Sequence, residues 1–116
     1  MLKRENRLKK NKQFKYIYKN GDGVRSGLVT LVYIKNRVKP FKVGFSVGSN
    51  VGKSVVRNKI KRRMKSILEG LIKDIDRRYN YIFVAKEGIE DVSYDDIKKD
   101  MCSCIKKAGL FNENSN

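Results

Sequence analysis

The feature that most restricts the fold is an apolar stripe that runs through residues 54–78. Its members recur at spacings of three and four residues, the period of one helix face: Val56, Ile60, Met64, Ile67, Leu68, Leu71, Ile72 and Ile75. The stripe predicts a helix from Ser54 to about Arg78, weakened locally by Gly70. One face of this helix must pack against other elements of the same chain.

Strands are predicted on both sides of this helix. Residues 28–35 and 41–47 are rich in β-branched and aromatic side chains and flank a turn, so residues 28–47 hold two strands or three. Residues 79–86 are apolar on both faces, which predicts a central strand. In residues 41–47 one face carries only Lys42, Gly44 and Ser46, so another surface can approach its backbone closely.

Two further helices complete the predicted domain. The first is Lys12–Asn20, with Asn11 as N-cap, Gly21 as its end, and an apolar face that contains Phe14, Ile17 and Tyr18. The last begins after Ser93, with Asp96 in the capping-box position, and ends at Gly109. We therefore predict one α+β domain over residues 1–116, with a basic flexible segment at 1–10 and a polar tail at 110–116.

Positive charge is concentrated in the first part of the chain. The 28 Lys and Arg residues exceed the 12 Asp and Glu residues by 16. Residues 1–66 carry 20 basic and 2 acidic residues, whereas residues 67–116 carry 8 basic and 10 acidic ones. This asymmetry indicates one cationic binding face, for which nucleic acid is the leading partner and an anionic membrane surface the second.

The composition excludes several kinds of chemistry. The chain has no histidine, so it has no Ser-His or Cys-His nucleophile and no zinc site that contains histidine. Cys102 and Cys104 would point about 200° apart on a helix, so we expect free thiols in a reducing compartment. No signal sequence or membrane-spanning run is recognisable, and a cytoplasmic location is expected.

Residues 48–54 follow a strand and precede a helix, as a phosphate-binding loop would. Three residues separate Gly48 from Gly52, whereas the Walker pattern requires four, and the strand at 79–86 ends in Lys86 instead of the Asp that would hold magnesium. A simple strand-to-helix turn is the better interpretation, and an NTP-binding enzyme is a weak alternative. The helix N-terminus and Lys53 would still attract a phosphate.

The polar side of the long helix is strongly basic. Arg57, Lys61 and Lys65 line one flank, close to the edge of the apolar stripe, where the helix meets the sheet. Further round the axis lie Asn58, Arg62, Lys59 and Arg63. A charged row at such a rim favours a site for a nucleic-acid backbone, although a solvated helix face is the simpler alternative. Asn58 adds a donor and an acceptor for a base or a 2′-hydroxyl.

These residues resemble a known family, the protein subunit of bacterial ribonuclease P. Val55–Arg62 is similar to the basic "RNR" motif of that family, and Asn6–Lys10 and Val43–Val47 add to the similarity. The resemblance implies a small α/β sandwich of order α-β-β-β-α-β-α, with a four-stranded sheet and a left-handed βαβ crossover. This is the ribosomal protein S5 domain 2-like fold.

The resemblance also implies a function. The family protein is a subunit of a ribonucleoprotein endonuclease that removes the 5′ leader from precursor tRNA. Its partners are ribonuclease P RNA and precursor tRNA, and the RNA subunit carries the catalysis with divalent metal (Mg). No catalytic residue, metal site or cofactor is therefore expected in this chain. A standalone basic RNA- or DNA-binding module, such as a ribosome-associated protein, is the alternative.

The resemblance assigns site residues to two regions. Contact with the RNA subunit is expected along the basic helix, where Lys53 joins the motif positions Arg57, Asn58, Lys59, Lys61, Arg62 and Lys65. The leader is expected at Phe14, Tyr18 and Tyr33, although the first two would be ordinary core residues if periodicity alone decided. Lys59 and Lys65 stand where the family has arginine, so they keep the charge and lose the planar fork for bidentate contacts.

Overall fold

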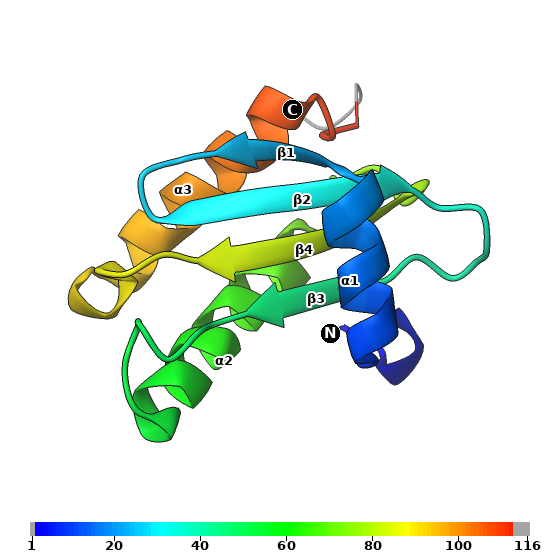
Figure 1. The fold of residues 1–116 in the computed structure, drawn as a ribbon. Coiled ribbons are helices and arrows are strands. Elements are labelled where there is room, and N and C mark those ends of the chain that lie inside the picture. Colours follow the sequence, from blue (N-terminus) through cyan, green and yellow to red (C-terminus); the bar gives the residue numbers. More distant parts are fainter. Residues whose placement is uncertain (1, 113–116) are drawn as a thin grey trace.

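The computed structural model describes residues 2–112. Helices and strands follow one another in the predicted order, with two short 3-10 turns inserted (Figure 1). The elements are a 3-10 turn at Arg4–Asn6, α1 (Asn11–Asn20), β1 (Asp22–Arg25), β2 (Val29–Lys35), β3 (Val43–Ser46), α2 (Ser54–Leu71), β4 (Tyr79–Ala85), a 3-10 turn at Ile89–Asp91 and α3 (Tyr94–Ala108). The predicted α-β-β-β-α-β-α order is confirmed.

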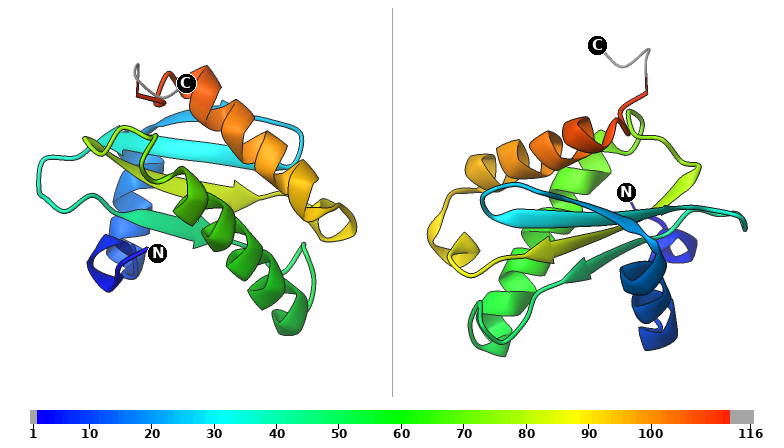
Figure 2. Two further views of the ribbon diagram at one scale, coloured as in Figure 1. Left: turned by 180° about the vertical axis from the view of Figure 1, so that it is seen from behind. Right: turned by 45° about the horizontal axis from the view of Figure 1, so that its top comes forward.

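The four strands form one sheet in the order β1-β2-β4-β3. The β1–β2 and β2–β4 pairs are antiparallel, and β3 runs parallel to β4. The predicted central strand is confirmed, since β4 lies between two neighbours. The connection from β3 to β4 passes through α2 on one face of the sheet and has the left-handed sense that the resemblance implied (Figure 2).

Helices cover the two faces unequally. Viewed from behind, α2 and α3 lie side by side over one face, and α1 alone crosses the other (Figure 2). The strands are two-sided because alternate side chains point to opposite faces. Leu31 and Phe83 belong to the main core under α2 and α3, whereas Ile82 packs with Leu8 and Ile17 in a smaller cluster under α1.

Several predicted boundaries were wrong. Residues 28–47 hold two strands, β2 and β3, as one of the predicted alternatives had it, and the third strand is β1, which lies before residue 28 where no strand was predicted. Its four residues are mostly exposed, so they carry no alternating apolar pattern. Helix α2 ends at Leu71 and not near Arg78. The apolar stripe in the sequence extends past the end of the helix because Ile75, in the following turn, is also fully buried. There it forms a β-bridge with Phe111.

Helix ends were predicted well by local chemistry. Ser93 caps α3, its hydroxyl oxygen accepting a hydrogen bond from the Asp96 N–H at 3.2 Å, and Gly109 ends the helix with φ of 71°. Asn11, the predicted cap of α1, is instead its first residue. The capping position is Lys10, whose N–H donates to the Gln13 side chain.

Both ends of the described chain differ from expectation. Leu2 and Leu8 are buried, so the segment predicted to be flexible packs against the sheet. Asn6 anchors it, its side-chain amide donating to the Phe41 carbonyl at 2.8 Å. Leu110 is buried and belongs to the core, so the predicted polar tail begins later; residues 113–116 lie outside the described part.

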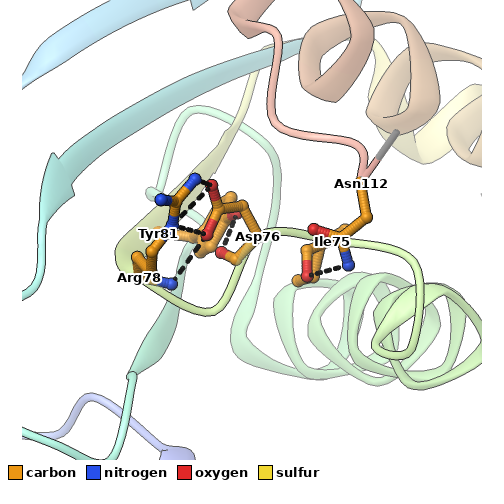
Figure 3. Close-up of polar contacts among 5 residues, drawn as sticks. All are labelled: Ile75, Asp76, Arg78, Tyr81 and Asn112. Atoms are coloured by element: carbon orange, nitrogen blue, oxygen red, sulfur yellow. Dashed lines mark hydrogen bonds and ion pairs between the residues drawn. The ribbon is translucent and has the colours of Figure 1, made fainter. Parts of the chain in front are cut away.

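The turn between α2 and β4 is tied by polar contacts (Figure 3). The Arg78 guanidinium donates to both carboxylate oxygens of Asp76, and the Tyr81 hydroxyl donates to the Asp76 carbonyl at 2.6 Å. Asn112 donates to the Ile75 carbonyl, which attaches the end of the described chain to the same turn. The hydrogen bond from Arg78 lowers the pKa of the Asp76 carboxyl, and burial raises the pKa of Tyr81.

The cysteines behave as predicted for free thiols. Cys104 is buried and donates to the Val29 carbonyl, and Cys102 is partly exposed. Burial raises the pKa of both thiols, so neither is an activated nucleophile. None of the helices formed by residues 2–112 is long and apolar enough to cross a membrane.

Candidate nucleic-acid interface

The basic face of α2 begins at its first turn and runs beside the free edge of β3. Ile60 and Met64 are buried against the sheet, which turns the polar side of the helix outward. Lys61 and Arg62 are exposed, whereas Arg57 and Lys65 are partly buried at the junction with the sheet. Arg57 and Lys65 thus lie where α2 meets the sheet, as predicted.

The segment before α1 supplies the opposite side of this rim. Arg7 bridges to Val43 in parallel, and the Leu8 N–H donates to the Val43 carbonyl at 2.9 Å, so the segment lies along the edge of β3. Arg7 and Lys9 thereby come close to α2, more than 50 residues further along the chain. Sequence reasoning missed both as site residues, although the Asn6–Lys10 motif contains them.

Together these elements form what we call the β3-edge groove. It is lined by Leu2, Arg7, Leu8 and Lys9 from the N-terminal segment, Val43, Gly44 and Phe45 from β3, and Lys61, Arg62 and Lys65 from α2. Five of these side chains are cationic and none is acidic. Arg57 lies outside this lining, and the Nε atoms of Arg7 and Arg57 are buried and make no hydrogen bond within residues 2–112.

A second groove, the aromatic groove, adjoins the first and shares Phe45 and Lys61 with it. Its other lining residues are Asn11, Phe14, Lys15 and Tyr18 from α1, and Ser46 and Val47 from the end of β3. The rings of Phe14 and Tyr18 lie 6.4 Å apart between centroids, and Tyr18 is 44% exposed. Two neighbouring rings beside lysines can stack the bases of a single strand.

Gly44 explains how α1 comes so close to the sheet. A Cβ atom at this position would lie 2.6 Å from the Phe14 ring and 3.0 Å from Leu8. The absence of a side chain therefore lets α1 rest directly on the backbone of β3. The small-residue face predicted for residues 41–47 is confirmed.

The structure separates Tyr33 from the other two predicted leader residues. Tyr33 pairs with Tyr81 in the sheet and packs with the main core, on the face of α2 and α3. Its ring contacts Tyr79 edge to face at 6.0 Å, and burial raises its pKa. Val32 takes the position that faces α1. Both faces of β2 are apolar, so alternation alone could not assign them.

The remaining predicted residues lie outside the two grooves. Lys53 caps α2, at the turn predicted for residues 48–54, and Asn58 and Lys59 are exposed on the outer side of the helix. Within residues 2–112, the Cys, Asp and Glu side chains form no cluster of three that could hold a metal ion.

Known proteins match nearly the whole of the described chain. The Ribonuclease P family model matches residues 2–109. A ribonuclease P protein component from Clostridium botulinum is 41% identical over 110 residues, which cover 94% of this chain and 99% of that protein. The chain belongs to the ribonuclease P protein component family. A second member, from Streptococcus agalactiae, is 32% identical and covers 95% of this chain and 100% of its own length.

Solved structures of the ribonuclease P family agree with the fold. The RNase P protein of Staphylococcus aureus superposes with a TM-score of 0.84 at 30% identity, over 92% of this chain and 98% of that one. The protein of Thermotoga maritima, 20% identical, shows the same fold with a TM-score of 0.76 over 84% of this chain and 92% of its own. The resemblance stated from the motifs is thus confirmed, together with the fold it implied.

Proposed function

We propose that this chain is the RNA-binding subunit of a ribonuclease P ribonucleoprotein and that it helps to remove the 5′ leader from precursor tRNA. One observation carries the proposal: two adjoining grooves free of acidic residues, one cationic and one aromatic, meet at the edge of β3. The first suits a folded RNA backbone and the second suits a single strand. Family membership supports this pairing of ligands.

The RNA subunit would contact the basic side of α2 and the N-terminal segment. Each Lys or Arg at the β3-edge groove neutralises a phosphate and releases counterions, so affinity would fall steeply with salt. We include the following residues in this contact: Arg7, Lys9, Lys53, Arg57, Asn58, Lys59, Lys61, Arg62 and Lys65.

The leader would lie in the aromatic groove. Its bases would stack on Phe14 and Tyr18 with little sequence preference, while Lys15 and Lys61 would neutralise its phosphates. Because mature tRNA has lost the leader, the protein would favour precursor over product. Tyr33 is no longer part of this proposal, since it faces the opposite side of the sheet.

We assign the hydrolysis itself to the RNA subunit and its divalent magnesium, in the cytoplasm where tRNA is processed. The protein would contribute electrostatics and positioning. It has no histidine to act as a general base near neutral pH.

The test is reconstitution with the RNA subunit at low magnesium, using precursors that carry either one leader nucleotide or about five. We expect the protein to stimulate cleavage and to bind the longer leader more tightly. Tyr18→Ala should remove about 1–3 kcal/mol of that preference. Tyr94→Ala is the matched control, because Tyr94 is 39% exposed on α3, the helix that covers the opposite face of the sheet.

Two results would contradict the proposal. Absence of stimulation by the wild-type protein would favour a standalone nucleic-acid-binding module. Stimulation that is independent of leader length would overturn the assignment of the aromatic groove.

A further inference from the structure

The loop that joins β2 to β3 lies to one side of α1 (Figure 1). A third groove is lined by residues of this helix and this loop. We call it the loop groove. Its volume is about 780 Å³, and it is lined by Leu8, Lys12, Gln13, Tyr16, Ile17, Ile34, Lys35, Asn36, Arg37, Val38, Lys39, Lys42 and Asn80. Neither the β3-edge groove nor the aromatic groove uses these residues, apart from Leu8.

The loop groove is cationic. Five of its side chains carry positive charge and none is acidic: Lys12, Lys35, Arg37, Lys39 and Lys42. None of the five forms an ion pair with another residue in the range 2–112. Such a group of like charges raises the local potential and calls for an anionic partner.

The loop groove also offers apolar surface. Ile17 and Ile34 form its floor, Tyr16 on its wall is 60% exposed, and Val38 in the loop is 76% exposed. An exposed ring among cations is typical of sites that neutralise phosphates and stack an unpaired base. The duplex regions of RNA, by contrast, keep their bases stacked inside the helix.

Hydrogen bonds hold the loop in place. The Asn36 N–H donates to the Arg78 carbonyl at 2.6 Å, and the Lys42 N–H donates to the Asn80 side-chain oxygen at 2.7 Å. The Asn36 side-chain oxygen accepts from the Val38 N–H. The amide NH₂ groups of Asn36 and Asn80 donate to no other residue of the range 2–112, so they remain available to a ligand in the groove.

We infer that the loop groove binds a second single-stranded RNA segment, contributed by the RNA subunit, while the leader occupies the aromatic groove. Helix α1 would then lie between two RNA strands. Tyr16 and Tyr18 point about 200° apart around the helix axis, so one short leader cannot use both rings. The inference rests on the proposed function, because that function supplies the RNA subunit.

The test uses the double variant Arg37→Gln/Lys39→Gln, whose two side chains are exposed and make no hydrogen bond within residues 2–112. Its matched control is Lys98→Gln/Lys99→Gln, an exposed pair on α3. Affinity for the RNA subunit alone is measured across a salt series. We expect the loop variant to bind roughly tenfold more weakly and to lose about 0.7 from the salt slope for each lost contact to a single strand.

Tyr16→Ala tests the stacking contribution in the same assay, and a circular-dichroism melt of each variant verifies the fold. We expect about a tenfold loss of affinity that persists at high salt, because stacking is not a charge interaction. Leader-length dependence should remain as in the wild-type protein for every loop-groove variant.

Three outcomes would overturn the inference. The first is an affinity of the loop variant for the RNA subunit equal to that of the α3 control. The second is a reduced dependence on leader length in both loop-groove variants, with their affinity for the RNA subunit unchanged. The third is loss of binding to anionic phospholipid vesicles without loss of RNA binding, which would indicate a membrane-surface site. Failure of the proposed function can be distinguished from failure of this inference, since in the former case the wild-type protein itself would not stimulate cleavage.

Discussion

The two faces of the sheet are built from the same strands but differ in how completely helices cover them. On one face, α2 and α3 cover Leu31, Tyr81 and Phe83, none of which is exposed. On the other face, α1 covers only a small cluster around Ile17 and Ile82, and cationic grooves lie on either side of the helix. The sealed face provides most of the buried apolar area, so the open face can keep rings and charges accessible to a ligand.

Charge follows this division only in part, because the basic helix α2 also covers the sealed face. Residues 23–68, which contain no Asp or Glu, supply β2, β3, their connecting loop and most of α2, which border the grooves. The acidic residues of the second half lie mainly on α3 and the turns around it, on the sealed side. The comparison therefore predicts that different parts of the molecule contribute unequally to stability, and three changes of decreasing effect test it.

The largest effect is expected from the sealed face. Phe83 is fully buried, and its ring stacks on those of Tyr81 and Phe45 at 6.2 and 6.0 Å. Phe83→Ala should lower the free energy of unfolding by about 3–5 kcal/mol through lost burial and a cavity. Phe14→Ala on the half-covered face should cost at most about half as much. Denaturant unfolding measures both, and equal losses would refute the contrast between the faces.

An intermediate effect is expected where α1 touches the sheet. Gly44→Ala would place a Cβ against the Phe14 ring and should destabilise the protein by about 1–3 kcal/mol. Gly70→Ala is the control, because nothing lies within 4 Å of the new atom, and it should stabilise α2 by up to about 1 kcal/mol. If the clash is the cause, Gly44→Ala should cost much less in the Phe14→Ala background than in the wild-type protein.

The smallest effect is expected at the turn after α2. The Arg78 hydrogen bonds lower the folded-state pKa of Asp76, so their contribution is present at neutral pH and is lost as pH falls through that pKa. Arg78→Gln should therefore lower the melting temperature at pH 7, and the difference should shrink below about pH 4. Arg77→Gln is the control, because the neighbouring Arg77 guanidinium donates to the Ile72 carbonyl, and it should show no such convergence. A difference that persists into acid would contradict the assigned cause.

Local signals predicted the elements whose stability depends on near neighbours. The central strand, the Ser93 cap and the Gly109 end were all recognisable, because each depends on side chains within a few residues. The short exposed strand β1 had no such signal and was missed. The end of α2 was placed too late, because Ile75 is buried by a contact with Phe111 and not by helical periodicity.

By itself, the sequence determined the α+β class, the basic face of α2 and the family. These follow from hydrophobic period, charge distribution and a contiguous motif, all of which are properties of neighbouring residues. Only the tertiary structure decided that Arg7 and Lys9 line one groove together with Lys61. It also decided that Tyr33 packs with the main core and that Tyr16 lines a separate groove. The physical reason is strand pairing: it sets register and face through contacts between residues distant in the chain.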